Sequence, residues 1–255
     1  MKEKYKSNKF ISFDMLTPQP HYVASVVGRD NILQIQTTLM NGKPQANFIA
    51  GNFFVHTDAI SYKGMCEANL NLKSKLLLID TPKALRKNIK TIRNKELKRV
   101  VYFTQPVELE VEKKMLLDLN EMLLDRKIEL YIKIHPRQKI ASYSFLKDVN
   151  VIAADFDVEM FDLAITRTSS IAIDCWIANL PIVFIRETGL MQSIDANYLP
   201  KDYIGDLKKA GELLSIINTY HEFISQYRAF REGIGLLVDD KQMLATIKKG
   251  LSNEA

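Results

Sequence analysis

Two short polar segments in the second half of the chain contain residues that could bind an anion. The first is KIHPR, Lys133 to Arg137, at the end of the strand-like run ELYIKI. Pro136 lacks an amide hydrogen and fixes its own φ, so it ends the strand and stiffens the turn, and His135 then projects at the edge of a sheet. A phosphate there would meet the imidazole and the charges of Lys133 and Arg137, and arginine can bind phosphate oxygens in bidentate fashion.

The second segment is TRTSSIAID, Thr166 to Asp174, between a strand and the helix that follows it. Ser169 or Ser170 is suited to cap this helix, whose free amides and positive dipole end attract anions. Arg167 adds a fixed charge, and Asp174 could brace the loop or contact a sugar hydroxyl. We therefore predict that this segment binds a donor phosphate or nucleotide through Arg167, Thr168, Ser169, Ser170 and Asp174.

Each segment alone is a modest signal, because a His-Pro pair is usually a structural turn and a Ser-Ser pair is usually a helix cap. Both follow strands, however, and ligands of open α/β sheets bind beyond the carboxyl ends of the strands. The two segments together therefore predict a crevice with two anion-binding edges, which would suit a nucleotide phosphate.

Residues 98–255 have the alternation of strands and helices that a doubly wound parallel sheet requires. The predicted strands are RVVYFTQ, ELYIKI, NVIAAD, DLAITR and PIVFIR, and the predicted helices are VELEVEKKMLLDLNEMLLDRK, SIAIDCWIAN and the tail from about Asp206. We expect one complete Rossmann-like, nucleotide-binding domain here.

Residues 1–97 contain three strand-like runs, NILQIQ, NFFVHT and KLLLID, after a polar arm that we expect to be loosely held up to about Pro20. This region is short for a complete domain. We therefore predict a reduced or incomplete α/β domain on the acceptor side, joined to the second domain by a basic linker at 83–99.

The linker holds eight basic residues and one acid, in a chain whose formal net charge is +5. It could form a helix that touches an anionic membrane, or a solvated helix face between the two halves. Nucleic acid is not expected, because no aromatic residues interleave with the cations. The excess of positive charge favours anionic partners such as phosphates and nucleotides.

Composition places the chain among soluble globular proteins, with 47% hydrophobic and 25% charged residues among 255. The two cysteines, Cys66 and Cys175, are too far apart in sequence for a CxxC pair, which fits a reducing compartment. Neither a secretory signal nor a membrane span is visible. We therefore expect a cytoplasmic protein, with peripheral attachment at the inner face of the membrane as a further option.

The order strand–TQP–helix, then KIHPR, then FDLAITRTSSIAIDCWIANLPIVFI resembles the nucleotide-binding half of GT-B-type transferases that build bacterial surface polysaccharides. The His-Pro and Ser-Ser pair is similar to that of bacterial sialyltransferases and polysialyltransferases, which use CMP-sialic acid. KxHP followed by SSxxxD is equally similar to CDP-glycerol glycerophosphotransferases. The resemblance covers roughly Val100 to Arg186, and NFIAGNFFVHTDAISYKGM resembles a segment near the end of the first domain in such enzymes.

This resemblance implies a glycosyltransferase that moves a sugar from a cytidine-nucleotide donor to a bacterial capsule or lipooligosaccharide glycan. His135 would contact the donor phosphate or assist the leaving group, Ser169 and Ser170 would hold phosphate oxygens, and Arg167 would imitate an arginine near the serine pair. CDP-glycerol transfer, a nucleotide-sugar epimerase and a catalytically degenerate nucleotide-binding partner of a polysaccharide synthesis complex stay open as alternatives.

The chain departs from these families in its first half. The acidic-acidic-glycine motif of the sialyltransferases has only Asn41-Gly42 as its nearest candidate, and the upstream histidine of the glycerophosphotransferases has only His21. Asp155 and Asp157 form a DxD that we assign to the solvated surface, so no metal is expected. We assign no role to His56, because it has no partners at ligand spacing.

Overall fold

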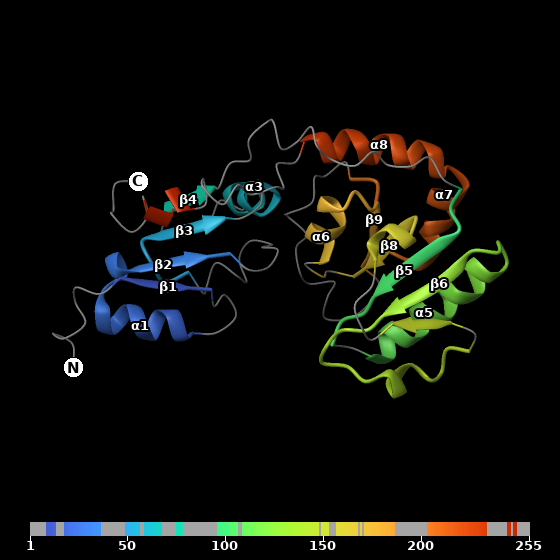
Figure 1. The fold of residues 1–255 in the computed structure, drawn as a ribbon, viewed down its shortest axis with the longest axis horizontal. Coiled ribbons are helices and arrows are strands. Elements are labelled where there is room, and N and C mark those ends of the chain that lie inside the picture. The colour runs from blue at the N-terminus through green and yellow to red at the C-terminus, as the bar shows by residue number, and fades with distance from the viewer. Residues whose placement is uncertain are drawn as a thin grey trace. The chain divides into compact units, whose positions relative to one another are not determined.

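The computed structural model describes residues 9–13, 18–36, 49–56, 59–67, 75–78, 96–106, 109–147, 149–152, 157–167, 169, 171–186, 203–233, 244–245 and 247–248. These residues form two parallel sheets with helices between their strands, as Figure 1 shows. The predicted α/β class with parallel sheets is therefore confirmed.

The first sheet has four parallel strands in the order β1-β2-β3-β4. The strands are β1 (Phe10–Ser12), β2 (Ile32–Ile35), β3 (Phe53–His56) and β4 (Lys75–Leu78), and the helical segments are α1 (Gln19–Val27), η2 (Arg29–Asn31) and α3 (Ala59–Glu67). Three of these strands are those predicted from the sequence.

The expectation of a loosely held arm up to about Pro20 is wrong for residues 10–12 and 19–20, which lie in a strand and a helix. Phe10 of β1 pairs with Ile32 of β2, so the arm contributes an edge strand. This strand is three residues long, which is too short for a period of two to show in the sequence. Pro20, which resembles loop punctuation in the sequence, lies in the first turn of α1, where its missing amide hydrogen costs no helical hydrogen bond.

The second sheet has six parallel strands in the order β10-β9-β8-β5-β6-β7, which is a doubly wound arrangement around β5. The strands are β5 (Arg99–Phe103), β6 (Glu129–Lys133), β7 (Asn150–Ile152), β8 (Leu163–Thr166), β9 (Ile182–Ile185) and β10 (Asp206–Leu207). The helical segments are α5 (Leu109–Leu124), η3 (Ile140–Tyr143), η4 (Val158–Met160), α6 (Ile171–Ile177), η6 (Ala210–Glu212), α7 (Leu213–Asn218) and α8 (Tyr220–Gly233).

Helices on both sides of the second sheet bury its central strands. Residues of β5, β8 and β9 are almost all inaccessible to solvent, as expected for a parallel sheet covered on both faces. Helix α5 lies along β6 (Figure 1). Trp176 of α6 is fully buried, with its ring 6.1 Å from that of Phe184 and 5.8 Å from that of Phe230, so it is a core residue.

The chain divides into two compact units. One comprises Met1–Asn88, Asp195–Lys201 and Ile234–Ala255, and the other comprises Ile89–Ile194 and Asp202–Gly233. The sequence predicted one boundary at 97/98, with the whole tail in the second domain.

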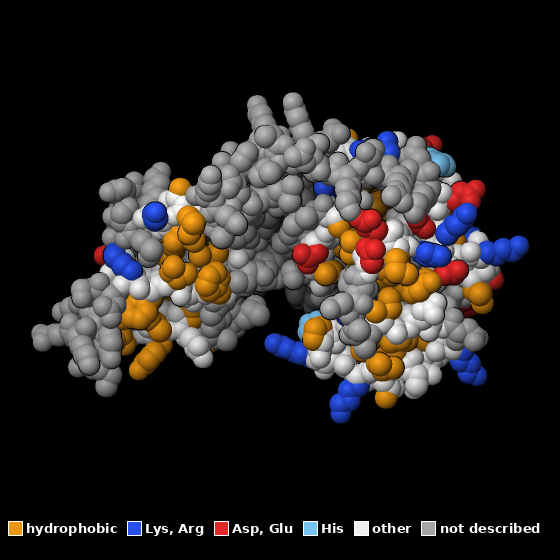
Figure 2. All heavy atoms as spheres, viewed as in Figure 1, with side chains coloured by type: hydrophobic (Ala, Val, Ile, Leu, Met, Phe, Trp, Pro, Cys, Tyr) orange, Lys and Arg blue, Asp and Glu red, His pale blue; other side chains and the backbone are white. Residues whose placement is uncertain are grey.

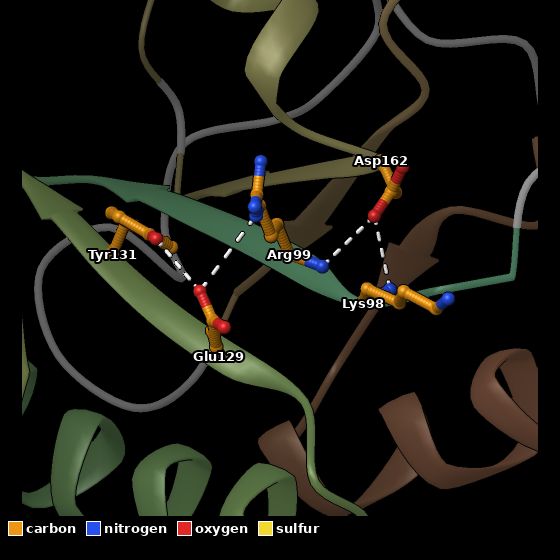
Figure 3. Close-up of polar contacts among 5 residues, drawn as sticks. All are labelled: Lys98, Arg99, Glu129, Tyr131 and Asp162. Atoms are coloured by element: carbon orange, nitrogen blue, oxygen red, sulfur yellow. Dashed lines mark hydrogen bonds and ion pairs between the residues drawn. The ribbon is translucent and has the colours of Figure 1, made fainter.

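The amino ends of three strands in the second sheet are held together by side chains (Figure 3). Asp162 Oδ2 accepts hydrogen bonds from the amides of Lys98 at 3.0 Å and Arg99 at 2.9 Å. Glu129 Oε2 lies 3.7 Å from Arg99 Nε and accepts a hydrogen bond of 2.7 Å from the Tyr131 hydroxyl. These polar groups therefore form hydrogen bonds and an ion pair with one another at the amino edge of the sheet.

On the face drawn in Figure 2, basic and acidic side chains are interspersed over the second unit. Among the described helices, none has the length and apolar character needed to cross a membrane.

Candidate functional site

The candidate site lies at the carboxyl edge of the second sheet, around the end of its central strand β5. Phe103 of β5 pairs with Lys133 of β6 on one side and with Thr166 of β8 on the other. The two predicted segments therefore leave the sheet at the same level, one on each side of Thr104. Two strand spacings separate β6 from β8, which corresponds to roughly 10 Å.

The first segment forms a tight turn after β6. The amide of Gln138 donates to the carbonyl of His135 at 2.8 Å, and the amide of Arg137 donates to His135 Nδ1 at 3.1 Å. Burial, followed by the charge of Arg137, lowers the pKa of His135. The ring is partly exposed, as are Lys133 and Gln138, while Pro136 and Arg137 are fully on the surface.

Side chains that the sequence did not single out tie this turn to β5. Thr104 Oγ1 accepts a 2.8 Å hydrogen bond from the His135 amide and donates to Gln138 Oε1. Gln138 Nε2 donates to the carbonyl of Gln105 at 2.8 Å, and its Oε1 also accepts from the His135 amide at 3.3 Å. The position of His135 is therefore set by the residues after β5 as well as by its own turn.

A buried carboxylate lies beneath this edge. Glu112 of α5 is fully buried, and its Oε1 accepts hydrogen bonds from the Tyr102 hydroxyl at 3.0 Å and the Gln105 amide at 3.1 Å. Its Oε2 accepts from the Tyr143 hydroxyl at 2.8 Å. Burial raises the pKa of Glu112, and these hydrogen bonds together with the charge of Arg167 act in the opposite direction.

Arg167 is fully buried at the end of β8. Its positive charge acts on the pKa of both Glu112 and Tyr102, so the guanidinium belongs to the charged cluster beneath the edge. The sequence indicated a fixed charge next to the serine pair, and the structure places that charge below the surface. A buried cation still attracts an anion above it, because the protein interior screens charge less than water does.

The second segment follows β8 and is held by a threonine and a serine. Thr166 Oγ1 donates to the carbonyl of Phe103 at 3.3 Å and accepts from the Ser169 amide at 3.4 Å. Ser169 Oγ accepts from the Ile171 amide at 3.3 Å, so its side chain binds one of the free amides at the start of α6. The hydroxyl proton of Ser169 stays available as a donor, since a hydroxyl can accept and donate at once.

The remaining predicted site residues have different outcomes. Asp174 lies one turn into α6 and is exposed, and desolvation of its carboxyl raises its pKa. Thr168 and Ser170 lie outside the described residues, as do Asn41, Gly42 and Asp155. His21 is exposed on α1. Among the described histidine, cysteine, aspartate and glutamate side chains, no group is arranged to hold a metal ion.

The missed residues of the site are Thr104, Gln105, Glu112, Gln138 and Thr166. TQP was part of the pattern that carried the family resemblance, and its place directly after a central strand was the signal that could have identified Thr104 and Gln105. Glu112 looked like one of several acids in the first turns of α5. Only the fold shows that this carboxylate points inward.

No protein-family model matches the chain, and a search of curated proteins gives no match. Solved structures do match in fold. A chain of accessory secretory protein 1, 2 and 3 from Streptococcus pneumoniae superposes with a TM-score of 0.54 and 10% identity over 100% of this chain, which spans 56% of that chain.

The UDP-GlcNAc 2-epimerase of Neisseria meningitidis, bound to UDP-GlcNAc, gives a TM-score of 0.53 and 8% identity, covering 91% of this chain and 79% of that one. The wall teichoic acid polymerase TagF gives a TM-score of 0.49 and 15% identity, covering 97% and 72%. The predicted GT-B-like fold class, with Rossmann-like domains, is confirmed.

Proposed function

We propose that this protein is a nucleotide-sugar-dependent glycosyltransferase whose donor is a cytidine nucleotide. The observation that carries the proposal is the arrangement of the second sheet, in which the His135 turn and the Ser169 segment flank the end of β5 at the same level. An anion held there would meet the imidazole on one side and the serine hydroxyl on the other. The carboxyl edge of a doubly wound sheet is where nucleotide phosphates bind.

The roles that we assign follow from the position of each side chain. The hydroxyl of Ser169 donates a hydrogen bond to a phosphate oxygen. Arg137 and Lys133 supply positive charge from the turn. Arg167 stabilises the same anion from beneath the surface, where its charge already acts on Glu112. His135 donates a hydrogen bond to the leaving phosphate. Thr168, Ser170, Pro136 and Asp174 complete the proposed donor site.

In the proposed reaction an acceptor hydroxyl oxygen attacks the anomeric carbon of a CMP-sugar, the bond between that carbon and the phosphate oxygen breaks, and CMP leaves. The acceptor hydroxyl proton is lost to a base or to water. Electrostatic stabilisation of the leaving phosphate is then the main contribution of the site. We propose a bacterial capsule or lipooligosaccharide glycan as acceptor, with sialic acid as the sugar.

Transfer of glycerol phosphate from CDP-glycerol is the alternative that fits the same residues. Its donor is a cytidine diphosphate, but the leaving group is CMP in this reaction too. The basic segment 83–99, most of which lies outside the described residues, would bring the enzyme to an anionic membrane surface. This contact is part of the proposal and would place the protein at the inner face of the cell membrane.

A second candidate function is a nucleotide-binding or assembly role without turnover. The likeness that favours it is to a chain of the accessory secretory protein structure, which extends over 100% of this chain at a TM-score of 0.54. An epimerase is favoured to a similar degree by the structure with bound UDP-GlcNAc. Donor preference and turnover separate these candidates.

The test is a thermal-shift titration with CMP, CDP, UMP, UDP, GDP and AMP. A ligand at about a hundred times its dissociation constant adds roughly 2.7 kcal/mol to the free energy of unfolding. We expect stabilisation by cytidine nucleotides, its loss in His135→Ala, and its retention in His221→Ala, which removes an exposed histidine from α8.

Turnover is then measured as slow hydrolysis of CMP-sialic acid without acceptor, which a catalytic protein should show. Binding without hydrolysis would favour the assembly role. A preference for UDP together with epimerisation of UDP-GlcNAc would favour an epimerase. No response to any nucleotide would refute the site and leave the two segments as a turn and a helix cap.

A further inference from the structure

The hydrogen bond between the Arg137 amide and His135 Nδ1 determines where the ring carries its proton. Nδ1 accepts this bond at 3.1 Å, so the proton of the neutral ring is on Nε2. A proton on Nδ1 would place the ring N–H opposite the N–H of Arg137. Both groups are donors, so the hydrogen bond would be lost. The turn therefore favours the neutral imidazole with an Nε2–H donor over both the other tautomer and the imidazolium.

The turn that makes this bond is itself held from β5. Thr104 and Gln138 both accept from the His135 amide, and Gln138 binds the carbonyl of Gln105 with its amide nitrogen. Loss of the Gln138 side chain would remove its hydrogen bonds to Thr104 and Gln105 and leave Thr104 Oγ1 as the acceptor for the His135 amide. The ring would then lose the support that keeps Nδ1 opposite the Arg137 amide.

The charges around His135 also disfavour a second proton on the ring. Its own strand and turn carry Lys133, Arg137 and Lys139, and burial and Arg137 lower its pKa. The residues directly after β5, Thr104 and Gln105, are uncharged. The strand β7 contributes the carbonyl of Ile152, which accepts from the Ile134 amide. The carboxylate of Glu112 accepts from the Gln105 amide and from two tyrosine hydroxyls.

We propose that His135 meets its anion as a neutral Nε2–H donor, and that Thr104 and Gln138 are positioning residues that hold the ring in this state. The proposal rests on the nucleotide site proposed above and narrows the role of His135 to hydrogen bonding without proton transfer. The chemistry permits this, because a phosphate monoester has a second pKa of about 6 and can leave without a proton at neutral pH.

The first test needs no ligand. In the whole protein labelled with ¹⁵N-histidine, two-bond proton–nitrogen spectra report the protonation of each ring nitrogen, and the His135→Gln variant identifies the signals of His135 among the four histidines. At about pH 7.5 we expect Nε2 protonated and Nδ1 unprotonated, with a shift toward mixed tautomers in Gln138→Leu. A charged ring or an Nδ1–H tautomer would overturn the proposal.

The second test measures CMP affinity by calorimetry from about pH 7 to about pH 9, where the CMP phosphate stays fully charged. A neutral donor predicts a change of less than about threefold. A required imidazolium would instead lose about tenfold in affinity for each pH unit above its pKa, roughly a hundredfold in total, which would contradict the proposal.

Matched substitutions at His135 locate the donor atom. The side-chain amide of glutamine reaches the position of Nε2, whereas that of asparagine reaches the position of Nδ1. We expect His135→Gln to keep CMP affinity within about fivefold, and His135→Asn and His135→Ala to lose about tenfold or more. Equal losses in all three would refute the Nε2–H donor. If the wild-type protein does not bind CMP, the proposed nucleotide site is refuted. The nitrogen spectra still show which ring nitrogen of His135 carries the proton.

Discussion

A histidine stands near the carboxyl end of a parallel strand in each of the two sheets, and the two rings carry their protons on opposite nitrogens. His56 is the last residue of β3, and its Nδ1 lies 3.0 Å from Gln36 Oε1. Because Gln36 Nε2 donates to Ser61 Oγ at 2.9 Å, its oxygen faces His56, and His56 Nδ1 must be the donor. In His135, by contrast, Nδ1 is the acceptor.

The surroundings of the two rings differ as strongly as their hydrogen bonds. His56 is fully buried, with the rings of Phe54 and Tyr62 4.9 and 5.5 Å from its own, and desolvation lowers its pKa to about 3. His135 is partly exposed at the edge of its sheet. The end of a parallel strand thus offers a histidine either a core position or a partly exposed position at the edge of the sheet, and the surrounding side chains decide which one it takes.

The polar support beneath the two edges also differs, and this difference leads to the largest expected effect. The polar partner of His56 is the neutral amide of Gln36, whereas a buried carboxylate and a buried guanidinium lie under the His135 edge. Replacing Glu112 by leucine removes the acceptor of three hydrogen bonds and the buried carboxylate on which the charge of Arg167 acts. We expect the free energy of unfolding of the second unit to fall by about 3–5 kcal/mol.

Urea unfolding followed by the fluorescence of Trp176, which lies in the second unit, measures this loss. Glu110→Leu is the matched control, since Glu110 lies on the same helix and is exposed. It should change the free energy of unfolding by less than about 0.5 kcal/mol. Equal effects of the two substitutions would show that the buried cluster adds no stability of its own.

The fold could largely be predicted from the sequence, because the buried strands are short apolar runs and the helix of residues 109–124 has a clear hydrophobic period. The runs that became β2 to β9 were each identified. Strand β1 and helix α1 were missed, since a three-residue edge strand shows no period and a proline at a helix start resembles a proline in a loop.

The candidate site was predictable only in outline. The strand ends indicated His135 and Ser169, because polar residues that follow buried strands stand out. Gln138 and Glu112 do not stand out, since they look like ordinary surface residues of a turn and a helix, whereas Thr104 follows a buried strand and could have been identified. Whether Arg167 or His56 is buried depends on packing between segments that are distant in the chain, which the sequence alone does not show.

The buried His56 predicts a loss of stability in acid, which is the second effect in size. Its pKa is about 6.5 when unfolded and about 3 when folded, so the unfolded state binds the proton first. Stability is complete above about pH 6.5 and falls by about 1.4 kcal/mol for each pH unit below it, down to about pH 3. At about pH 4.5 the first unit should therefore have lost about 2.7 kcal/mol.

Hydrogen exchange of the β2 and β3 amides, corrected for the intrinsic pH dependence of exchange, measures this loss. His56→Leu should remove most of the dependence, and His135→Gln should retain it. If the stability of His56→Leu depended on pH as strongly as that of the wild type, other groups would cause the acid sensitivity. The two histidines would then not differ in their effect on the free energy of unfolding.

The smallest expected effect separates the two glutamines that hold the histidines. Gln36→Leu leaves the buried Nδ1–H of His56 without its acceptor, which should lower the free energy of unfolding by about 1–3 kcal/mol. Gln138→Leu should cost about 1 kcal/mol or less, because Gln138 is partly exposed and water can replace its hydrogen bonds.

Gln138→Leu should, however, weaken CMP binding, which Gln36→Leu should leave intact. Urea unfolding measures the stability of both variants, and calorimetry measures their affinity for CMP. If the two variants had the same stability and the same CMP affinity, the two glutamines would support their sheet edges in the same way.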